Sequence, residues 1–271
     1  MAGLKSLAKD TVIYGLSSIV GRFLNYLLVP LYTAKMSAAS GGYGVVTNVY
    51  SYTDLLLVIL VYGMETTLFR YSTKEGEDPK RVYSTILTSV GFTSLLFVAL
   101  VLLFLSPISG AMGYAEHPEY IGVMAVVVAM DAFQAIPFSF LRQQKKALKF
   151  AALKFLFIVI NVSLNLLYFV ALPALYTSYP DAVGAIYSPE VGVGYVFYLN
   201  LVCTSIVMLC LIPELRGFKW VFDWSLFKRM IAYSSPILLL GIAGVLNQNA
   251  DKIMFPFLYE QADAKSQLGI Y

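Results

Sequence analysis

Long apolar runs separated by short polar segments make up most of the sequence. An α-helix needs about 20 residues to cross the hydrocarbon core of a bilayer, and each run is at least that long. The pattern therefore predicts seven membrane-spanning helices. They cover approximately residues 11–33, 43–68, 82–106, 119–141, 150–173, 190–213 and 229–258. The first run is too long for a signal peptide, contains Arg22 and is followed by further spans, so it is predicted to remain in the membrane.

The composition agrees with lipid as the solvent. Of the 271 residues, 59% are hydrophobic and only 13% are charged, whereas a soluble domain has about 45–50% and about 25%. These proportions predict an all-α integral membrane protein. Cys203 and Cys210 lie in one apolar run and are expected to be buried small hydrophobes. The single histidine, His117, lies in a loop, which argues against a zinc site.

The basic residues of the loops are unevenly distributed. If successive loops alternate between the two sides of the membrane, fifteen of the 19 Lys and Arg residues share the side of the N-terminus. They are Lys5, Lys9, Arg70, Lys74, Lys80, Arg81, Arg142, Lys145, Lys146, Lys149, Lys154, Arg216, Lys219, Lys228 and Arg229. Lys35 and Lys265 lie on the other side, and Arg22 and Lys252 fall within spans. Because cytoplasmic loops are enriched in Lys and Arg, the N-terminus is predicted to be cytoplasmic.

Residues 214–228 differ from the other loops because aromatic and basic side chains are interleaved there. Such a mixture suits the headgroup layer, so we predict a cytoplasmic interfacial linker, with Asp223 or Ser225 capping the seventh span. The linker divides the chain into a six-helix lobe, residues 1–213, and the start of a second lobe, residues 229–271.

A weak internal repeat supports this division. Pro30 near the end of the first span corresponds to Pro256 near the end of the seventh, and Gly42 corresponds to Gly269. A further helix is therefore expected to begin near residue 268. Because transporters are often built from repeated helix bundles, the sequence is expected to be the first half of a protein about twice as long.

Ionisable residues within the spans are the main candidates for function, because placing one at the bilayer centre costs at least about 2.5 kcal/mol. Arg22 lies in the middle of the first span, where it either meets an anionic substrate or pairs with an acid on another helix. Asp54, at a similar depth on the second span, is its natural partner. Glu65 follows eleven residues later, about three helical turns, and is predicted to point the same way unless it simply reaches the interface.

Further polar residues lie on the later spans. Asp131, close to Gln134 and Pro137, either binds a proton or Na⁺ beside a helix kink or makes a helix–helix hydrogen bond. Three amides are expected to hydrogen-bond between helices. They are Asn161, Asn165 and Asn200. The apolar run of the seventh span is broken near its external end, which predicts a wet surface there. The polar residues are Asn247, Gln248, Asn249, Asp251 and Lys252, of which the last two are expected to neutralise groups across the lobe interface.

Several motifs, spread over almost the whole chain, resemble those of bacterial oligosaccharide flippases. They are Gly21-Arg22-Phe23-Leu24-Asn25, Pro30-Leu31-Tyr32, Gly42-Tyr43-Gly44, Ile136-Pro137-Phe138 with Leu141-Arg142, the run 222–229 with Tyr233 and Pro236, and Ala250-Asp251-Lys252. By this resemblance the chain is identified as a member of the polysaccharide-transporter branch of the multidrug/oligosaccharidyl-lipid/polysaccharide exporter superfamily. The resemblance implies a MATE-like bundle in the bacterial inner membrane. Its two six-helix lobes would surround a central cavity that opens alternately to either side.

The resemblance also implies a substrate, an oligosaccharide on an undecaprenyl diphosphate carrier. Coupling to a proton or Na⁺ gradient is implied, and no other cofactor. Expected partners are this lipid-linked oligosaccharide, membrane lipids, and the polymerase and glycosyltransferases of polysaccharide synthesis, but no nucleic acid. The predicted site uses Arg22, Asn25 and Lys252 for the diphosphate, and Asp54, Glu65, Asp131 and Asp251 as ion-coupling or cavity charges.

Two other functions remain open. The acids Asp54, Glu65 and Asp131 would suit a cation-coupled multidrug exporter of the same superfamily, whereas Arg22 would not. A non-transporting scaffold of a polysaccharide synthesis complex is the second alternative. An enzyme is not expected, because the sequence has neither a G-x-x-x-x-G-K-[ST] phosphate loop nor a G-x-S-x-G elbow.

Overall fold

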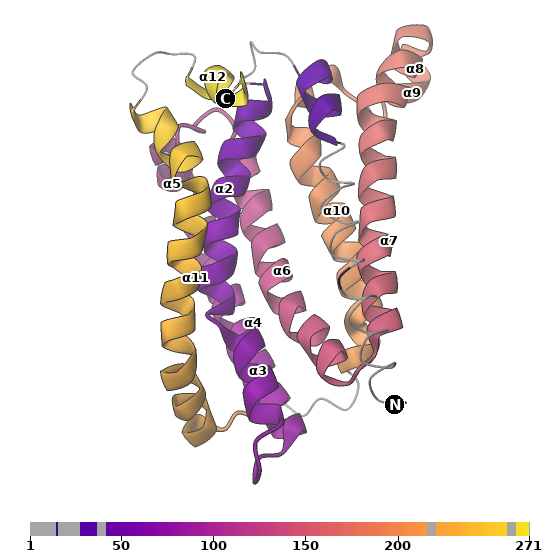
Figure 1. Cartoon of the computed structure of the whole chain (residues 1–271). Coiled ribbons are helices and arrows are strands. Elements are labelled where there is room, and N and C mark those ends of the chain that lie inside the picture. The colour runs from indigo at the N-terminus through magenta and orange to yellow at the C-terminus, as the bar shows by residue number, and fades with distance from the viewer. Residues whose placement is uncertain (1–14, 16–27, 37–41, 216–220, 259–263, 271) are drawn as a thin grey trace.

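The computed structural model describes residues 15, 28–36, 42–215, 221–258 and 264–270. Within these residues every regular element is helical, and the long helices run side by side as an elongated bundle (Figure 1). Six helical stretches are long and apolar enough to cross a membrane. The chain is therefore an all-α, multi-pass membrane protein. Most of the first predicted span, 11–33, lies outside the described residues.

The six stretches correspond to the second to seventh predicted spans. They are Gly42–Ser72 (α2 Gly42–Val61 and α3 Met64–Ser72), α4 Pro79–Leu103, α6 Pro118–Gln143, Ala147–Ser178 (α7 Ala147–Leu166, η2 Leu167–Ala171 and α8 Leu172–Ser178), Gly194–Leu215 (α10 Gly194–Leu211 and η4 Ile212–Leu215) and α11 Trp224–Leu258. Short helices connect or follow them. These are α5 Leu105–Ala111, α9 Pro180–Val183, η3 Pro189–Val191 and α12 Ala264–Ile270.

The predicted boundaries need three adjustments. Residues 174–189, between the fifth and sixth predicted spans, are largely helical instead of a loop, because α8 extends to Ser178 and α9 and η3 follow. The linker predicted over 214–228 overlaps two helices, because η4 extends to Leu215 and α11 begins at Trp224, and residues 216–220 of it lie outside the described residues. The last helix begins at Ala264 rather than near residue 268.

Polar caps and prolines explain where several helices begin. Before α4, the Asp78 side chain accepts a hydrogen bond from the Lys80 backbone N–H at 3.0 Å, and Pro79 follows at the first helical position. Before α11, the Asp223 Oδ1 atom accepts from the Leu226 N–H at 2.9 Å. Of the two predicted caps for the seventh span, Asp223 is therefore confirmed.

The first of these stretches, Gly42–Ser72, is interrupted between α2 and α3. Tyr62 and Gly63 both adopt positive φ angles, 35° and 72°, which end one helix and start the next. The prediction that Asp54 and Glu65 share one face of a continuous helix was therefore wrong. The regular 3.6-residue rotation that it assumed is lost at the break.

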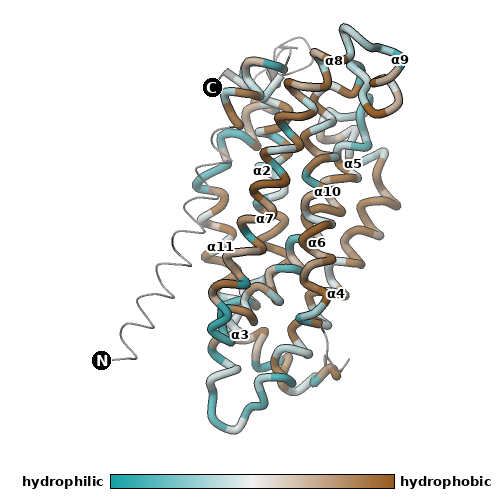
Figure 2. Tube along the Cα trace, turned by 90° about the vertical axis from the view of Figure 1, so that its right-hand side faces the viewer, coloured by the Kyte–Doolittle hydropathy of each residue, from teal (hydrophilic) through white to brown (hydrophobic). Residues whose placement is uncertain are grey.

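Helix α6 lies at the centre of the bundle and contacts α2, α4, α7 and α10. One buried apolar cluster joins α2, α6 and α10, with Val49, Met124 and Phe197 among its members. A second cluster joins α3, α4, α6 and α11 through residues such as Ile136 and Met230. Figure 2 shows that hydrophobic residues dominate the middle of the helices, whereas hydrophilic residues gather at the α3 end.

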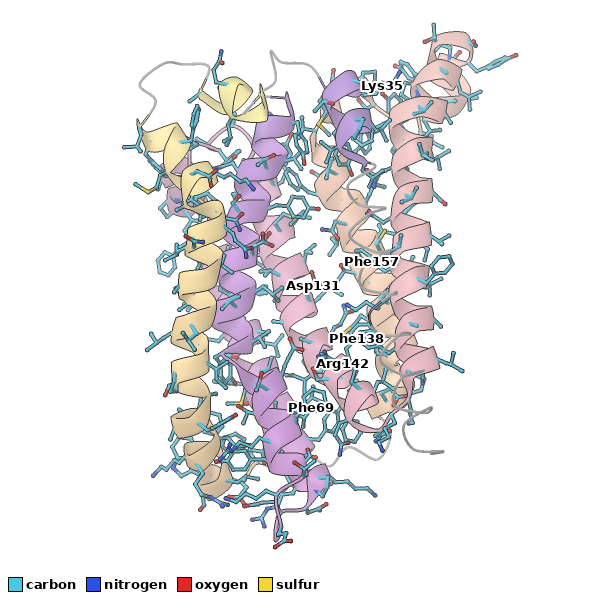
Figure 3. All side chains as sticks on the ribbon, in the orientation of Figure 1. Lys35, Phe69, Asp131, Phe138, Arg142 and Phe157 are labelled. Atoms are coloured by element: carbon cyan, nitrogen blue, oxygen red, sulfur yellow. The ribbon has the colours of Figure 1, made fainter. Side chains whose placement is uncertain are left out.

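The loops separate into two ends, as the alternation of spans requires. The α3–α4 connection, the α6–α7 connection and the start of α11 lie at one end, called here the basic end (Figure 1). Helices α5, α9 and α12 lie at the opposite end, where Figure 3 also places Lys35. The side of the membrane that each end faces stays a prediction from the charge distribution.

Candidate functional site

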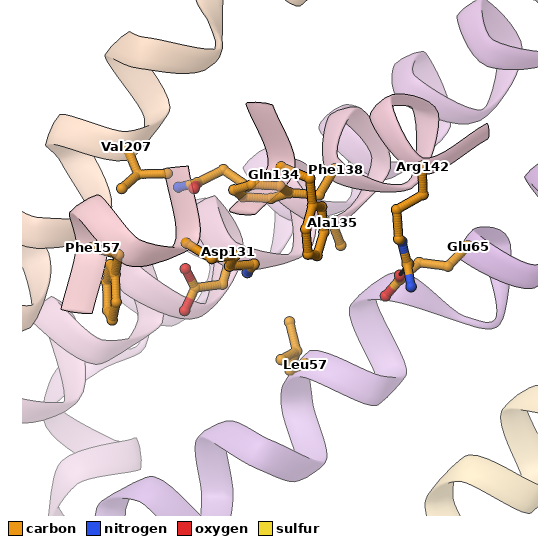
Figure 4. Close-up of a pocket in the computed structure, with 11 residues that line it drawn as sticks. Leu57, Glu65, Asp131, Gln134, Ala135, Phe138, Arg142, Phe157 and Val207 are labelled. Carbon is orange, nitrogen blue, oxygen red and sulfur yellow. Dashed lines mark hydrogen bonds and ion pairs between the residues drawn. The ribbon is translucent and has the colours of Figure 1, made fainter. Parts of the chain in front are cut away.

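A cavity of about 420 Å³, called here the charged cavity, lies towards the basic end between α2, α3, α6, α7 and α10. Two acids and two bases share its wall. They are Glu65, Asp131, Arg142 and Lys154. Figure 4 shows Glu65 and Arg142 facing each other at one side, with Asp131 and Phe157 at the other. The remaining lining residues are Leu57, Gln134, Ala135, Phe138, Phe150 and Val207.

The Glu65 carboxylate is held by two groups of α6. An Arg142 guanidinium nitrogen lies 2.7 Å from Glu65 Oε2, and the Ser139 hydroxyl donates to the same oxygen at 2.8 Å. Both charged side chains are partly exposed, 38% for Glu65 and 35% for Arg142. Glu65 therefore faces the cavity in an ion pair between α3 and α6.

Lys154 lies on α7, two turns from its start, and its ammonium is 4.1 Å from the centre of the Phe138 ring. It lines the same cavity as Asp131 and Glu65. The aromatic face stabilises the ammonium through a cation–π contact. A cation is thus kept facing the cavity rather than the loop.

Asp131 connects the charged cavity to a second one. Its Oδ1 atom accepts a hydrogen bond from the Thr204 hydroxyl of α10 at 3.4 Å. Gln134, one turn further along α6, donates to the Thr204 carbonyl oxygen at 3.1 Å. Asp131 and Phe157 line both cavities, so the two cavities adjoin at this level of the bundle.

The second cavity, called here the polar cavity, also has a volume of about 420 Å³ and lies towards the opposite end. Tyrosines, amides and charged groups line much of it. They are Tyr32, Tyr43, Thr47, Tyr50, Ser51, Asp54, Asp131, Asn161, Asn200, Asn249 and Lys252. The Asn200 side chain donates to the Tyr50 hydroxyl at 2.7 Å, which fixes both groups at the wall.

Helix α11 contributes one side of the polar cavity. Asn249 donates to Asp54 Oδ2 at 3.1 Å and accepts from the Lys252 ammonium at 3.5 Å. The Asn48 amide donates to the Lys252 carbonyl oxygen at 2.9 Å. The polar residues near the end of the seventh span therefore join α11 to α2, and α11 continues unbroken through them.

The structure brings together most, but not all, of the predicted site residues. Asp54 and Lys252 line the polar cavity, Glu65 lines the charged cavity, and Asp131 lines both. Asp251 is exposed and is absent from the described lining of either cavity. Arg22 and Asn25 lie outside the described residues, so the predicted pair of Arg22 with Asp54 stays a prediction.

The three predicted amides have different settings. Asn165 accepts a hydrogen bond from the Tyr32 hydroxyl at 2.7 Å and donates to the Asn161 carbonyl oxygen at 2.8 Å. Asn165 and Asn200 thus join helices, as predicted. Asn161 and Asn200 also line the polar cavity, so packing is only part of their role.

Sequence reasoning missed two members of the site. Arg142 and Lys154 were counted among the basic loop residues, but both lie on helices and line the charged cavity. A signal for Lys154 was present, because it falls inside the predicted span 150–173. Within the part of the chain that the structure describes, no group of His, Cys, Asp and Glu residues could hold a metal ion.

Comparison with known protein families identifies the family to which this chain belongs. The family model described as "Polysaccharide biosynthesis protein" matches residues 7–271. The chain belongs to this family. No curated protein and no solved structure matches the chain.

For this polysaccharide biosynthesis protein, family and architecture agree. The bundle has six apolar stretches of spanning length, and the charged cavity and the polar cavity adjoin inside it. These are features of a membrane transporter. The family indicates that its role is related to polysaccharides.

Proposed function

We propose that the protein moves an oligosaccharide linked to undecaprenyl diphosphate across the bacterial inner membrane by alternating access. Membership of a polysaccharide biosynthesis family supports the polysaccharide substrate. The observation that carries the proposal is the pair of adjoining charged and polar cavities within a membrane-spanning bundle. The basic end would face the cytoplasm, in keeping with its excess of Lys and Arg.

The chemistry of the cavity walls suits such a headgroup. Transfer of a diphosphate into hydrocarbon is prohibitive unless cations and polar groups replace its water. Arg142 and Lys154 supply cations to the charged cavity, and Lys252 supplies one to the polar cavity. The hydroxyl of Tyr50 and the amide of Asn161 are groups that hydrogen-bond to sugars. The lipid tail would remain in the surrounding hydrocarbon.

Asp131 is the proposed coupling group for a proton or Na⁺ gradient. It lies where the two cavities adjoin, and its carboxylate contacts Thr204 of α10. Ion binding there would change the contact between α6 and α10. The proposed partners are the lipid-linked oligosaccharide, membrane lipids, and the polymerase and glycosyltransferases that act before and after transport, and no enzymatic step is proposed.

A cation-coupled multidrug exporter is the second candidate. The carboxylates of Asp54, Glu65 and Asp131 in the cavity walls favour it. Arg142 and Lys154 balance the two acids of the charged cavity, however, and this balance favours an anionic headgroup over a cationic drug.

Arg22 provides the direct test, in a strain whose own complete gene is deleted and replaced by variants. We expect Arg22→Ala to abolish surface polysaccharide and to accumulate the lipid-linked intermediate. Arg22→Lys should restore export only in part, because an ammonium lacks the paired N–H donors of a guanidinium. Lys80→Ala, which removes an exposed cation outside both cavities, is the matched control.

Normal surface polysaccharide and no accumulated intermediate in Arg22→Ala would remove the substrate role of Arg22. The deletion strain tests the function itself. If this strain makes surface polysaccharide normally but becomes sensitive to cationic drugs, the multidrug-exporter hypothesis replaces the flippase hypothesis.

A further inference from the structure

A third cavity, of about 310 Å³, lies on the other side of α2 from the polar cavity. Its α2 wall is formed by Val49, Tyr52, Thr53, Leu55 and Leu56. All of these except Leu55 have the i, i+3, i+4, i+7 spacing of one helix face. Tyr50 and Asp54, which line the polar cavity, point from the opposite face. The third cavity, called here the apolar cavity, is thus separated from the proposed transport path by the body of α2.

Residues of three other helices and of the turn after α5 complete the wall of the apolar cavity. Helix α4 contributes Phe97 and Val101, α5 contributes Ile108, and Met112 lies directly after α5. Helix α6 contributes Ile121, Met124 and Ala125. Four helix faces therefore converge on one space, next to α5 and the first turns of α6.

No polar atom of the described lining residues is exposed in this wall. Thr53 illustrates the reason, because its hydroxyl donates to the Tyr50 carbonyl oxygen of its own helix at 2.8 Å. A water molecule in such a cavity would lack the two to four polar partners that it needs. An apolar cavity of about 150 Å³ in another protein stays dry and binds benzene or xenon. The space here is larger, and leaving it empty forfeits dispersion contacts along its whole wall.

The bilayer supplies the ligand that this wall selects. Helix α4, which forms one side, exposes Phe92, Leu95 and Leu100 on its outer surface, where lipid chains are the solvent. Met112 and Met124 add flexible side chains that adapt to an irregular hydrocarbon. Phospholipid acyl chains are the most abundant hydrocarbon at this depth, so mass action favours them.

We infer that the apolar cavity between α2, α4, α5 and α6 is a binding site for one acyl chain of a membrane phospholipid. Because α5 and the start of α6 lie at the end opposite the basic end, the chain comes from the leaflet at that end. The bound chain fills the space between the two buried apolar clusters, which both include Phe97 at their margin.

Photolabelling in a bilayer tests this site. The protein, expressed from its complete gene, is reconstituted in vesicles containing phosphatidylcholine with a diazirine in the middle of one acyl chain. After illumination, labelled peptides are quantified by mass spectrometry. We expect label at residues 108–112 and 121–125, well above residues 86–90 of the buried core. Residues 92–96, on the lipid-facing surface of α4, are the positive reference.

Two filling variants sharpen the test. Met112→Trp and Ala125→Phe occupy the apolar cavity and should reduce its labelling several-fold while residues 92–96 label as before. Leu95→Trp, at a side chain that is 74% exposed and outside the cavity wall, is the control and should change nothing at the cavity. If a filling variant does not fold, the ratio of peptides in the unmodified protein still decides.

Three outcomes would overturn the inference. The first is labelling of the cavity peptides no higher than that of residues 86–90. The second is unchanged labelling in a well-folded filling variant. The third is preferential labelling by a diazirine-bearing polyprenyl phosphate at the same mole fraction, which would make the occupant an isoprenoid instead of an acyl chain.

Discussion

At the scale of single residues, the role of a charged side chain depends on where its charged group lies in the bundle. Lys154 and Lys149 are both lysines of α7, five residues apart. Lys149 forms an ion pair with Glu214 near the basic end, whereas Lys154 lines the charged cavity with Asp131. The two side chains differ in depth and in direction because they are five residues apart on one helix. One therefore forms an ion pair at the end of the bundle, and the other belongs to the candidate site.

Replacing Lys154 tests whether this cation serves transport. We expect Lys154→Ala to reduce surface polysaccharide strongly, because the wall of the charged cavity would then hold Asp131 and Glu65 with Arg142 as the remaining basic group. The double variant Lys154→Ala with Asp131→Asn should not restore export if Lys154 acts on the substrate and Asp131 on the coupling ion. Surface polysaccharide and the lipid-linked intermediate are measured together, with Lys80→Ala as control. Full export by the double variant would instead identify a purely structural pair.

At the scale of helices, the break between α2 and α3 sets the direction of the spanning stretch Gly42–Ser72. Gly63 has a φ of 72°, and a Cβ atom there would lie 3.1 Å from both Ile237 Cβ and the Ser234 carbonyl oxygen of α11. Glycine therefore permits both the turn and the close approach of α11.

Substitution of Gly63 should destabilise the bundle. We expect Gly63→Ala to lower the free energy of unfolding by about 1–3 kcal/mol, from backbone strain at positive φ and crowding against α11. Denaturant unfolding in mild detergent measures it. Gly110→Ala is the control, because no other described residue, apart from its chain neighbours and the backbone of its own helix, has an atom within 4 Å of an added Cβ. Equal stability of the two variants would show that the Gly63 conformation is not required.

The start of α11 is a second element with a defined local cause. The Leu226 backbone N–H, and then the Arg81 guanidinium, hold the pKa of Asp223 below its ordinary value. A depressed folded-state pKa stabilises the protein above the ordinary pKa, and that contribution is lost as the pH falls through the folded pKa.

This linkage predicts a pH-dependent effect of Asp223→Ala. At about pH 7 the variant should melt at a lower temperature than the unmodified protein, since cap and ion pair are both lost. The difference should shrink below about pH 4, the ordinary range of an aspartate. Ser225→Ala, at the cap position that the structure does not use, should have little effect. A constant difference across this pH range would contradict the assignment.

At the scale of the whole molecule, the bundle has two chemically distinct ends and a polar interior between them. Ion pairs gather at the basic end, where Arg229 contacts Glu77 at 2.6 Å and Lys146 contacts Glu214 at 3.4 Å. The charged and polar cavities adjoin at Asp131 and extend towards both ends. An alternating opening of these two cavities is the motion that the proposed function requires.

Reporter fusions test the orientation of the whole bundle. Fusions at Lys80 and Lys146, at the basic end, should place the reporter in the cytoplasm. Fusions at His117 and Asp181, between spans at the opposite end, should place it outside. Paired fluorescent and alkaline phosphatase reporters give opposite signals on the two sides. A reversed pattern would overturn the orientation and with it the proposed direction of transport.

The sequence by itself determined the membrane-spanning class and the approximate spans. Apolar runs such as residues 82–106 and 119–141 correspond to α4 and α6 to within a few residues. Hydropathy works here because each helix satisfies its own backbone in lipid, so length and apolarity suffice to identify it. The sequence likewise predicted a helix cap at Asp223 or Ser225, since capping is local to a few residues, and the structure decided for Asp223.

Only the tertiary structure decided which polar residues meet. The break at Gly63 redirected Glu65 towards Arg142, and Lys154 was placed in the charged cavity rather than among the loop cations. Asn249 joined Asp54 to Lys252 across 195 residues of sequence. The rotation of each helix about its axis depends on packing with its neighbours, and a hydropathy pattern along one helix does not contain that information.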